Sequence, residues 1–77
     1  MSERVLIAAR NHETAVRYAR RHGIVWWSYI SGPEVLLGYR GVRVLGVGEW
    51  RRGPVPELDL IVRQYGLQFE EVPDDRA

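Results

Sequence analysis

The residues best suited to bind an anion stand in two short segments, each directly after an apolar run. Arg10-Asn11-His12 follows the first run, and Gly48-Glu49-Trp50-Arg51-Arg52 follows a later one. Guanidinium groups pair with phosphate oxygens, a Trp ring can stack on a base, and a helix N-terminus offers free N–H groups. Ser31 ends another apolar run and is a further candidate. These residue types favour a phosphate, a nucleotide or single-stranded nucleic acid as the ligand.

Each of these residues also has an ordinary structural role. Asn11 is a good helix N-cap, and a residue such as His12 in a first helical turn is commonly solvated. Arg51-Arg52 beside a Gly-Pro pair is typical of an exposed loop, and Trp50 can pack beneath that loop as readily as it stacks on a base. Both interpretations of the segments therefore stay open.

The motifs of common enzyme and cofactor sites are missing. No glycine lies between the first apolar run and the helix expected after it, which excludes a phosphate loop and a dinucleotide fingerprint there. Glu49 is alone at its strand end, so no carboxylate pair for metal-dependent phosphoryl transfer is evident. The chain has no Cys, and its two His residues have no ligand partners at metal spacing. We expect no enzyme, cofactor or metal; catalysis through His12 and Glu49 is the weakest hypothesis.

Apolar runs alternate with helical patterns along the whole chain. Asn11 and Gly23 bound the first helix, and the apolar residues of the second recur at helical spacing. The expected elements are a strand at 5–9, a helix at 12–22, a strand at 24–30, a helical turn at 34–37, a strand at 42–48, a loop at 51–56, a helix at 56–65 and a strand at 67–72.

This order, β-α-β-(short α)-β-α-β, predicts an α/β domain with a small four-stranded, mostly parallel sheet. We expect the strand order 2-1-3-4 and a half-Rossmann or flavodoxin-like topology, with the direction of the last strand left open. Residues 1–72 form one domain, and residues 73–77 form an acidic, frayed tail. Ligands of such sheets bind beyond the carboxyl ends of the strands, here between the first and third strands.

Aromatic residues are numerous for a chain of 77 residues, whose core is small. Trp26, Trp27 and Tyr29 fall in one expected strand, where successive side chains face opposite sides of the sheet. Helices on both faces would cover both indoles. Otherwise one indole belongs to a contact surface, and a homo-oligomer is the simplest partner.

All eleven basic residues are Arg, which a GC-rich genome explains most simply and which selection for bidentate phosphate contacts would also explain. Arg17, Arg20 and Arg21 share the polar face of the first helix and are candidates for phosphate contacts, although such a face is usually only solvated. Residues 1–52 hold nine Arg and four acids, whereas residues 53–77 hold two Arg and six acids. This division could steer an anionic partner or align molecules head to tail, and the acidic tail could cover the basic surface.

Arg interrupts each apolar stretch, so no membrane span is expected, and the N-terminus lacks a secretory signal. A cytoplasmic location is the default expectation.

The pattern of Val5–Arg10, Tyr18-Ala19-Arg20 and the segment from Tyr39 to Trp50 spans much of the chain. It resembles small α/β proteins of phages that infect GC-rich actinobacteria. It is also similar to the Rossmann-like half of a helicase or terminase ATPase without the phosphate loop. The phage resemblance implies an accessory protein that binds host or phage macromolecules in the host cytoplasm, and neither resemblance transfers a catalytic residue.

Two functions follow from the sequence. The first is a non-enzymatic binding or assembly module that self-associates, with Trp26, Trp27 and Tyr29 as interface candidates, and contacts a macromolecular partner. The alternative is a nucleotide or single-stranded nucleic-acid binder that uses the arginines and Trp50 at the sheet edge. The identity of the partner and the number of subunits are not encoded in any motif of the sequence.

Overall fold

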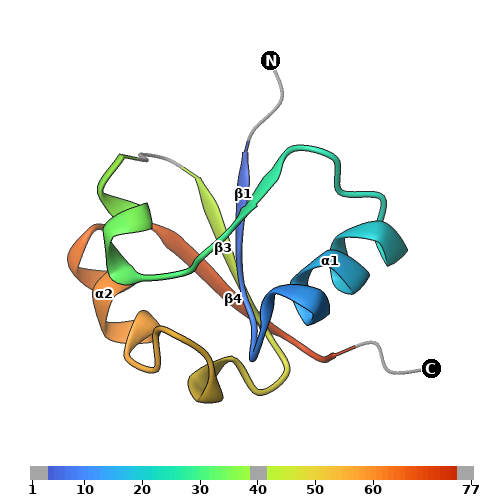
Figure 1. Cartoon of the computed structure of the whole chain (residues 1–77). Helices are drawn as coiled ribbons and strands as arrows, with labels where there is room; N and C mark the ends of the chain where they lie inside the picture. Colours follow the sequence, from blue (N-terminus) through green and yellow to red (C-terminus); the bar gives the residue numbers. More distant parts are fainter. Residues whose placement is uncertain (1–3, 39–41, 75–77) are drawn as a thin grey trace.

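Four strands form one parallel sheet, as the alternation of apolar runs and helices predicts. The computed structural model describes residues 4–38 and 42–74. Its strands are β1 (Val5–Ala8), β2 (Trp27–Tyr29), β3 (Arg43–Val47) and β4 (Gln68–Val72). They lie in the order β2-β1-β3-β4, and each neighbouring pair is parallel (Figure 1). The predicted strand order is confirmed, and the last strand runs parallel to its neighbour.

Two α-helices and two short 3₁₀ helices connect the strands. They are α1 (His12–Arg21), η1 (Pro33–Gly38), η2 (Trp50–Arg52) and α2 (Leu58–Gln64). Asn11 caps α1, because its Oδ1 accepts hydrogen bonds from the N–H and the hydroxyl of Thr14, both at 2.8 Å. The helical turn expected at 34–37 is the 3₁₀ helix η1, and the loop expected from residue 51 begins within η2.

The sheet is covered on both faces, by α1 on one side and by η1 and α2 on the other (Figure 1). Successive side chains of β1 point to opposite faces of the sheet. Leu6 packs with residues of α2, while Ile7 packs with residues of α1, and both are fully buried. This double burial explains why the sequence of β1 is a continuous apolar run rather than an alternating one.

The strand expected over residues 24–30 is much shorter than predicted and leaves two apolar side chains in solvent. Val25 is 78% exposed and Trp26 is 57% exposed, and both precede β2. Trp27 packs with the apolar cluster beneath α1. The interpretation in which helices cover both indoles is therefore wrong. β2 lies at the edge of the sheet, and the residues just before it, Val25 and Trp26, are exposed to solvent.

Candidate functional site

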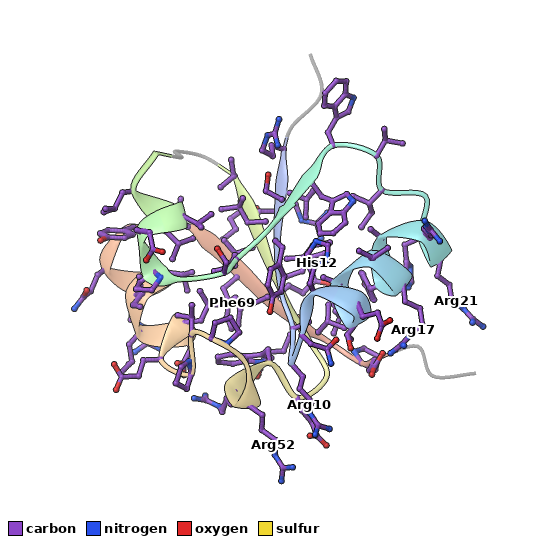
Figure 2. The ribbon with its side chains drawn as sticks, in the orientation of Figure 1. Arg10, His12, Arg17, Arg21, Arg52 and Phe69 are labelled. Atoms are coloured by element: carbon purple, nitrogen blue, oxygen red, sulfur yellow. The ribbon has the colours of Figure 1, made fainter. Side chains whose placement is uncertain are left out.

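Three predicted site residues meet at the carboxyl edge of the sheet. Glu49 Oε2 lies 3.4 Å from Arg52 Nε and 4.0 Å from Arg10 Nη1. Both guanidinium groups are more than half exposed, and both arginines lie at the same end of the sheet in Figure 2. One carboxylate thus serves two cations, and an anion at this edge has to compete with Glu49.

The Trp50 ring is buried and is not exposed at this edge. Its side chain is 2% exposed, its Nε1 donates to Glu71 Oε1 at 2.9 Å, and its ring meets Phe69 edge-on at 5.3 Å. Gly46 makes room for it, since a Cβ there would lie 2.7 Å from Trp50 Cδ1. Of the two roles that the sequence left open for Trp50, the structure has the packed one, because both the ring and its N–H have partners within the fold.

The Arg51 side chain contacts Trp50 and α2 rather than Arg10, Glu49 or Arg52. Its Nη2 donates to Asp59 Oδ2 at 2.7 Å, and its guanidinium carbon lies 4.5 Å from the centre of the Trp50 ring. This hydrogen bond holds the pKa of Asp59 below its ordinary value. Arg51 therefore ties η2 to α2 rather than extending the edge formed by Arg10 and Arg52.

The remaining edge candidates have structural partners or stand apart. Asn11 is the cap of α1, and Ser31 is exposed after β2. The ring of the exposed His12 lies near two aromatic rings: the distance between ring centres is 5.2 Å to Tyr29 and 6.1 Å to Trp27. Tyr29 donates its hydroxyl to the carbonyl of Ala9 at 3.4 Å, and partial burial raises the pKa of this phenol.

The space beyond the end of β1 is partly filled by the chain itself. A Cβ at Gly53 would overlap the carbonyl oxygen of Ala9, so the backbone after η2 lies directly against the end of β1. This close approach reduces the crevice in which a ligand was expected. Binding at the edge stays a prediction, with Arg10 and Arg52 as its exposed cations.

The polar face of α1 is more open than the sheet edge. Arg17, Arg20 and Arg21, with Glu13 and Val16, line a broad, shallow hollow of about 770 Å³. Figure 2 shows Arg17 and Arg21 extending from α1 on the side away from the sheet. Within the described ranges 4–38 and 42–74, the guanidinium groups of Arg20 and Arg21 form no hydrogen bond or ion pair.

Asp74 bears on a question that the sequence left open, namely whether the acidic tail covers the basic surface. Its carboxylate accepts from Arg17 Nη2 at 3.1 and 3.3 Å, and its side chain is only 16% exposed. The chain after β4 passes α1 on its way to this pair (Figure 1). The first part of the segment expected to be a frayed tail is therefore attached to the basic face, while residues 75–77 lie outside the described part of the chain.

Neither a metal site nor a membrane helix is found in the part of the chain that the structure describes. No three His, Asp or Glu side chains there gather as metal ligands. No helix there is both long and apolar enough to cross a membrane.

The fold defines a small three-layer α/β protein with a parallel sheet between helices. No protein-family model, curated protein or solved structure matches the chain. The resemblances to phage proteins and to half of an ATPase domain stay predictions, as does the half-Rossmann assignment.

Proposed function

We propose that this protein is a non-enzymatic assembly module that self-associates through the surface formed by Val25 and Trp26. The supporting observation is the exposure of these two neighbouring apolar side chains, 78% and 57%, in a small domain. Trp is strongly enriched among the residues that dominate interface energies, and an exposed Trp beside another apolar residue is typical of a contact surface.

The Val25–Trp26 surface is held by the fold. The carbonyl of Trp26 accepts a hydrogen bond from the N–H of Val5 at 3.0 Å, which fixes the backbone at the start of β1. The next residue begins β2, where Trp27 is registered against Val5. A partner therefore meets a surface whose backbone is already fixed, and little backbone entropy is lost on binding.

A second copy of the chain is the partner that fits this surface best. Among the residues that the structure describes, β2 pairs with β1 alone, so the outer side of Trp27–Tyr29 is an edge of the sheet whose backbone groups can pair with another strand. A two-fold axis beside this edge would pair two identical edges antiparallel and would place each Val25–Trp26 surface beside the carboxyl end of β2 in the second copy. Such an isologous contact closes after two subunits and leaves no open end.

The alternative, an anionic ligand at the carboxyl edge, has less support. Arg10 and Arg52 lie there, but they share Glu49, and Trp50 is withdrawn into the core. Catalysis through His12 and Glu49 also stays a prediction: His12 contacts aromatic rings, whereas Glu49 contacts arginines.

Light scattering over a wide range of protein concentration tests the proposal. The wild-type mass should rise with concentration to that of a discrete oligomer, and Trp26→Ser should weaken association about thirtyfold or more. Leu60→Ser is the matched control, because Leu60 is 53% exposed but lies on α2. A wild-type mass that stays monomeric at every concentration would refute the proposal, as would equal losses in the two variants.

A further inference from the structure

We infer that the arginine face of α1, formed by Arg17, Arg20 and Arg21, binds the phosphate backbone of a nucleic-acid duplex, and that Asp74 competes with the phosphates for Arg17. This inference concerns a surface other than the Val25–Trp26 surface and goes beyond self-association. Its basis is the open hollow on α1 together with the ion pair that closes one side of it.

Three guanidinium groups share one side of a single helical turn. Arg17, Arg20 and Arg21 are spaced i, i+3 and i+4, which places them together on the solvent side of α1. The guanidinium groups of Arg20 and Arg21 have no hydrogen-bond or ion-pair partner among the residues that the structure describes, and both residues are exposed. The planar guanidinium group of Arg donates two parallel hydrogen bonds to phosphate oxygens. Two of the three arginines are available for such contacts, and the third, Arg17, is held by Asp74.

The shape and lining of the hollow favour nucleic acid over a small molecule or a protein. Small-molecule sites are concave, enclosing and mostly apolar, whereas this hollow is broad and shallow and Val16 is its one apolar lining residue. The centres of protein–protein interfaces combine Arg with aromatic residues and Met, and no aromatic residue or Met lines this hollow. Interfaces with nucleic acid are much more positively charged, as this surface with its three arginines is.

The hollow also favours a duplex over a single strand. Single-strand binding depends on exposed aromatic rings on which bases stack. No aromatic side chain lines this hollow, and the nearby Tyr18 is buried and stacks on His22 at 4.1 Å. Contacts to a duplex backbone need only positioned donors, which the three arginines supply.

Asp74 occupies the position that a phosphate would take on Arg17. Both of its carboxylate oxygens lie within 3.3 Å of Arg17 Nη2. Gly48 holds this segment in place: its N–H donates to the Val72 carbonyl at 2.8 Å, and a Cβ on it would lie 2.7 Å from Asp74 Cβ. Gly48 also has a φ of 56°, a conformation that suits glycine, so the turn after β3 is shaped to receive the C-terminal segment.

Arg20 and Arg21 also suit the C-terminal end of the α1 dipole, which is a purely structural role. Lysine would preserve that role but would lose the bidentate geometry. A variant with Arg20→Lys and Arg21→Lys should keep the stability of the fold and bind the duplex more weakly than the wild type does.

Fluorescence anisotropy with a short labelled DNA duplex tests the inference. Three phosphate contacts predict a slope of about −2.7 for log affinity against log salt, or a loss of about fortyfold between about 50 and 200 mM salt. Arg21→Gln should reduce the size of the slope by about one. Arg63→Gln is the matched control, because Arg63 is also exposed in the last turn of a helix but lies on α2.

Removal of the competing carboxylate should have the opposite effect. Asp74→Asn frees Arg17 and should tighten duplex binding, by up to about fivefold for an exposed ion pair. Glu57→Gln is the control for the general effect of removing one negative charge, since Glu57 is exposed and makes no capping hydrogen bond at the start of α2. Trp26→Ser, assayed in parallel, keeps the arginine face and should still bind, so that a failure of self-association is distinguished from a failure of duplex binding.

Several results would overturn the inference. These are no duplex binding at low salt, equal affinity and slope in Arg21→Gln and Arg63→Gln, or a double lysine variant that binds as the wild type does. Tighter binding of the matching single strand would point to base stacking, and tighter binding of polyglutamate would point to an acidic protein. An affinity of Asp74→Asn no higher than that of Glu57→Gln would remove the competing role of Asp74.

Discussion

A single arginine can join several parts of a small fold, and Arg51 illustrates how. Its guanidinium group lies over the Trp50 ring, donates to Asp59 and reaches the carbonyl oxygen of Pro56 at 3.3 Å. The group is still more than half exposed, so each contact is partly screened by water. Together the contacts connect η2 with α2 and place a cation on the solvent side of the indole.

The Arg51–Asp59 contact predicts a measurable titration. Arg51→Gln should raise the pKa of Asp59 toward its ordinary value, because the charged hydrogen bond that lowers it is removed. NMR titration of the Asp59 carboxyl carbon measures this directly. Because the pKa is lowered in the folded state, the contact stabilises the fold above the unfolded-state pKa, and this stabilisation is lost as the pH falls through the folded-state value.

The variant should therefore lose more stability near neutral pH than in acid. Arg63→Gln, with a similar exposed guanidinium on α2, is the control and should leave the titration of Asp59 unchanged. An Asp59 that titrates identically with and without Arg51 would show that the contact is not formed in solution.

Among the elements, the segment from β3 to α2 departs most from what its sequence indicates. It contains the predicted edge residues, yet η2 turns back so that Trp50 enters the core and Gly53 lies against β1. A Cβ at Gly53 would overlap the Ala9 carbonyl oxygen, a backbone atom that cannot move without disturbing β1. The turn can therefore approach the end of β1 this closely because residue 53 is a glycine.

Gly53→Ala should destabilise the fold by about 1–3 kcal/mol, the usual range for overpacking. Gly38→Ala is the matched control, because an added Cβ there meets no atom within 4 Å. Urea unfolding of the two variants measures the difference in free energy. Equal stability of the two variants would contradict the close contact between Gly53 and β1.

The elements and their order were predictable because they depend on local patterns. The Asn11 cap, the apolar stripe of α2 and the alternation of strands and helices predict the order β2-β1-β3-β4 without any long-range contact being known, although they leave the direction of β4 open. The partners of individual side chains were not predictable. Trp50 meets Glu71 only because β4 lies beside β3, and such pairings depend on register rather than on local sequence.

At the scale of the whole molecule, the unequal charge distribution is partly balanced within one chain. Acidic residues of the last third contact arginines of the first two-thirds, in the pairs Arg17–Asp74, Arg43–Glu70 and Arg51–Asp59. These contacts weaken the argument for head-to-tail alignment of molecules by charge. The positive charges of Arg20 and Arg21 on α1 are not balanced by such contacts. The apolar Val25–Trp26 surface is therefore the stronger basis for assembly.

The most direct test of self-association through the Val25–Trp26 surface is a dilution series followed by the NMR signals of the three indole N–H groups. Trp26 is exposed, whereas the indole N–H of Trp50 is bonded to Glu71 inside the fold. The proposal predicts that the Trp26 signal shifts with concentration while the Trp50 signal stays fixed. Three signals that are unchanged at every concentration, with a monomeric mass, would contradict it.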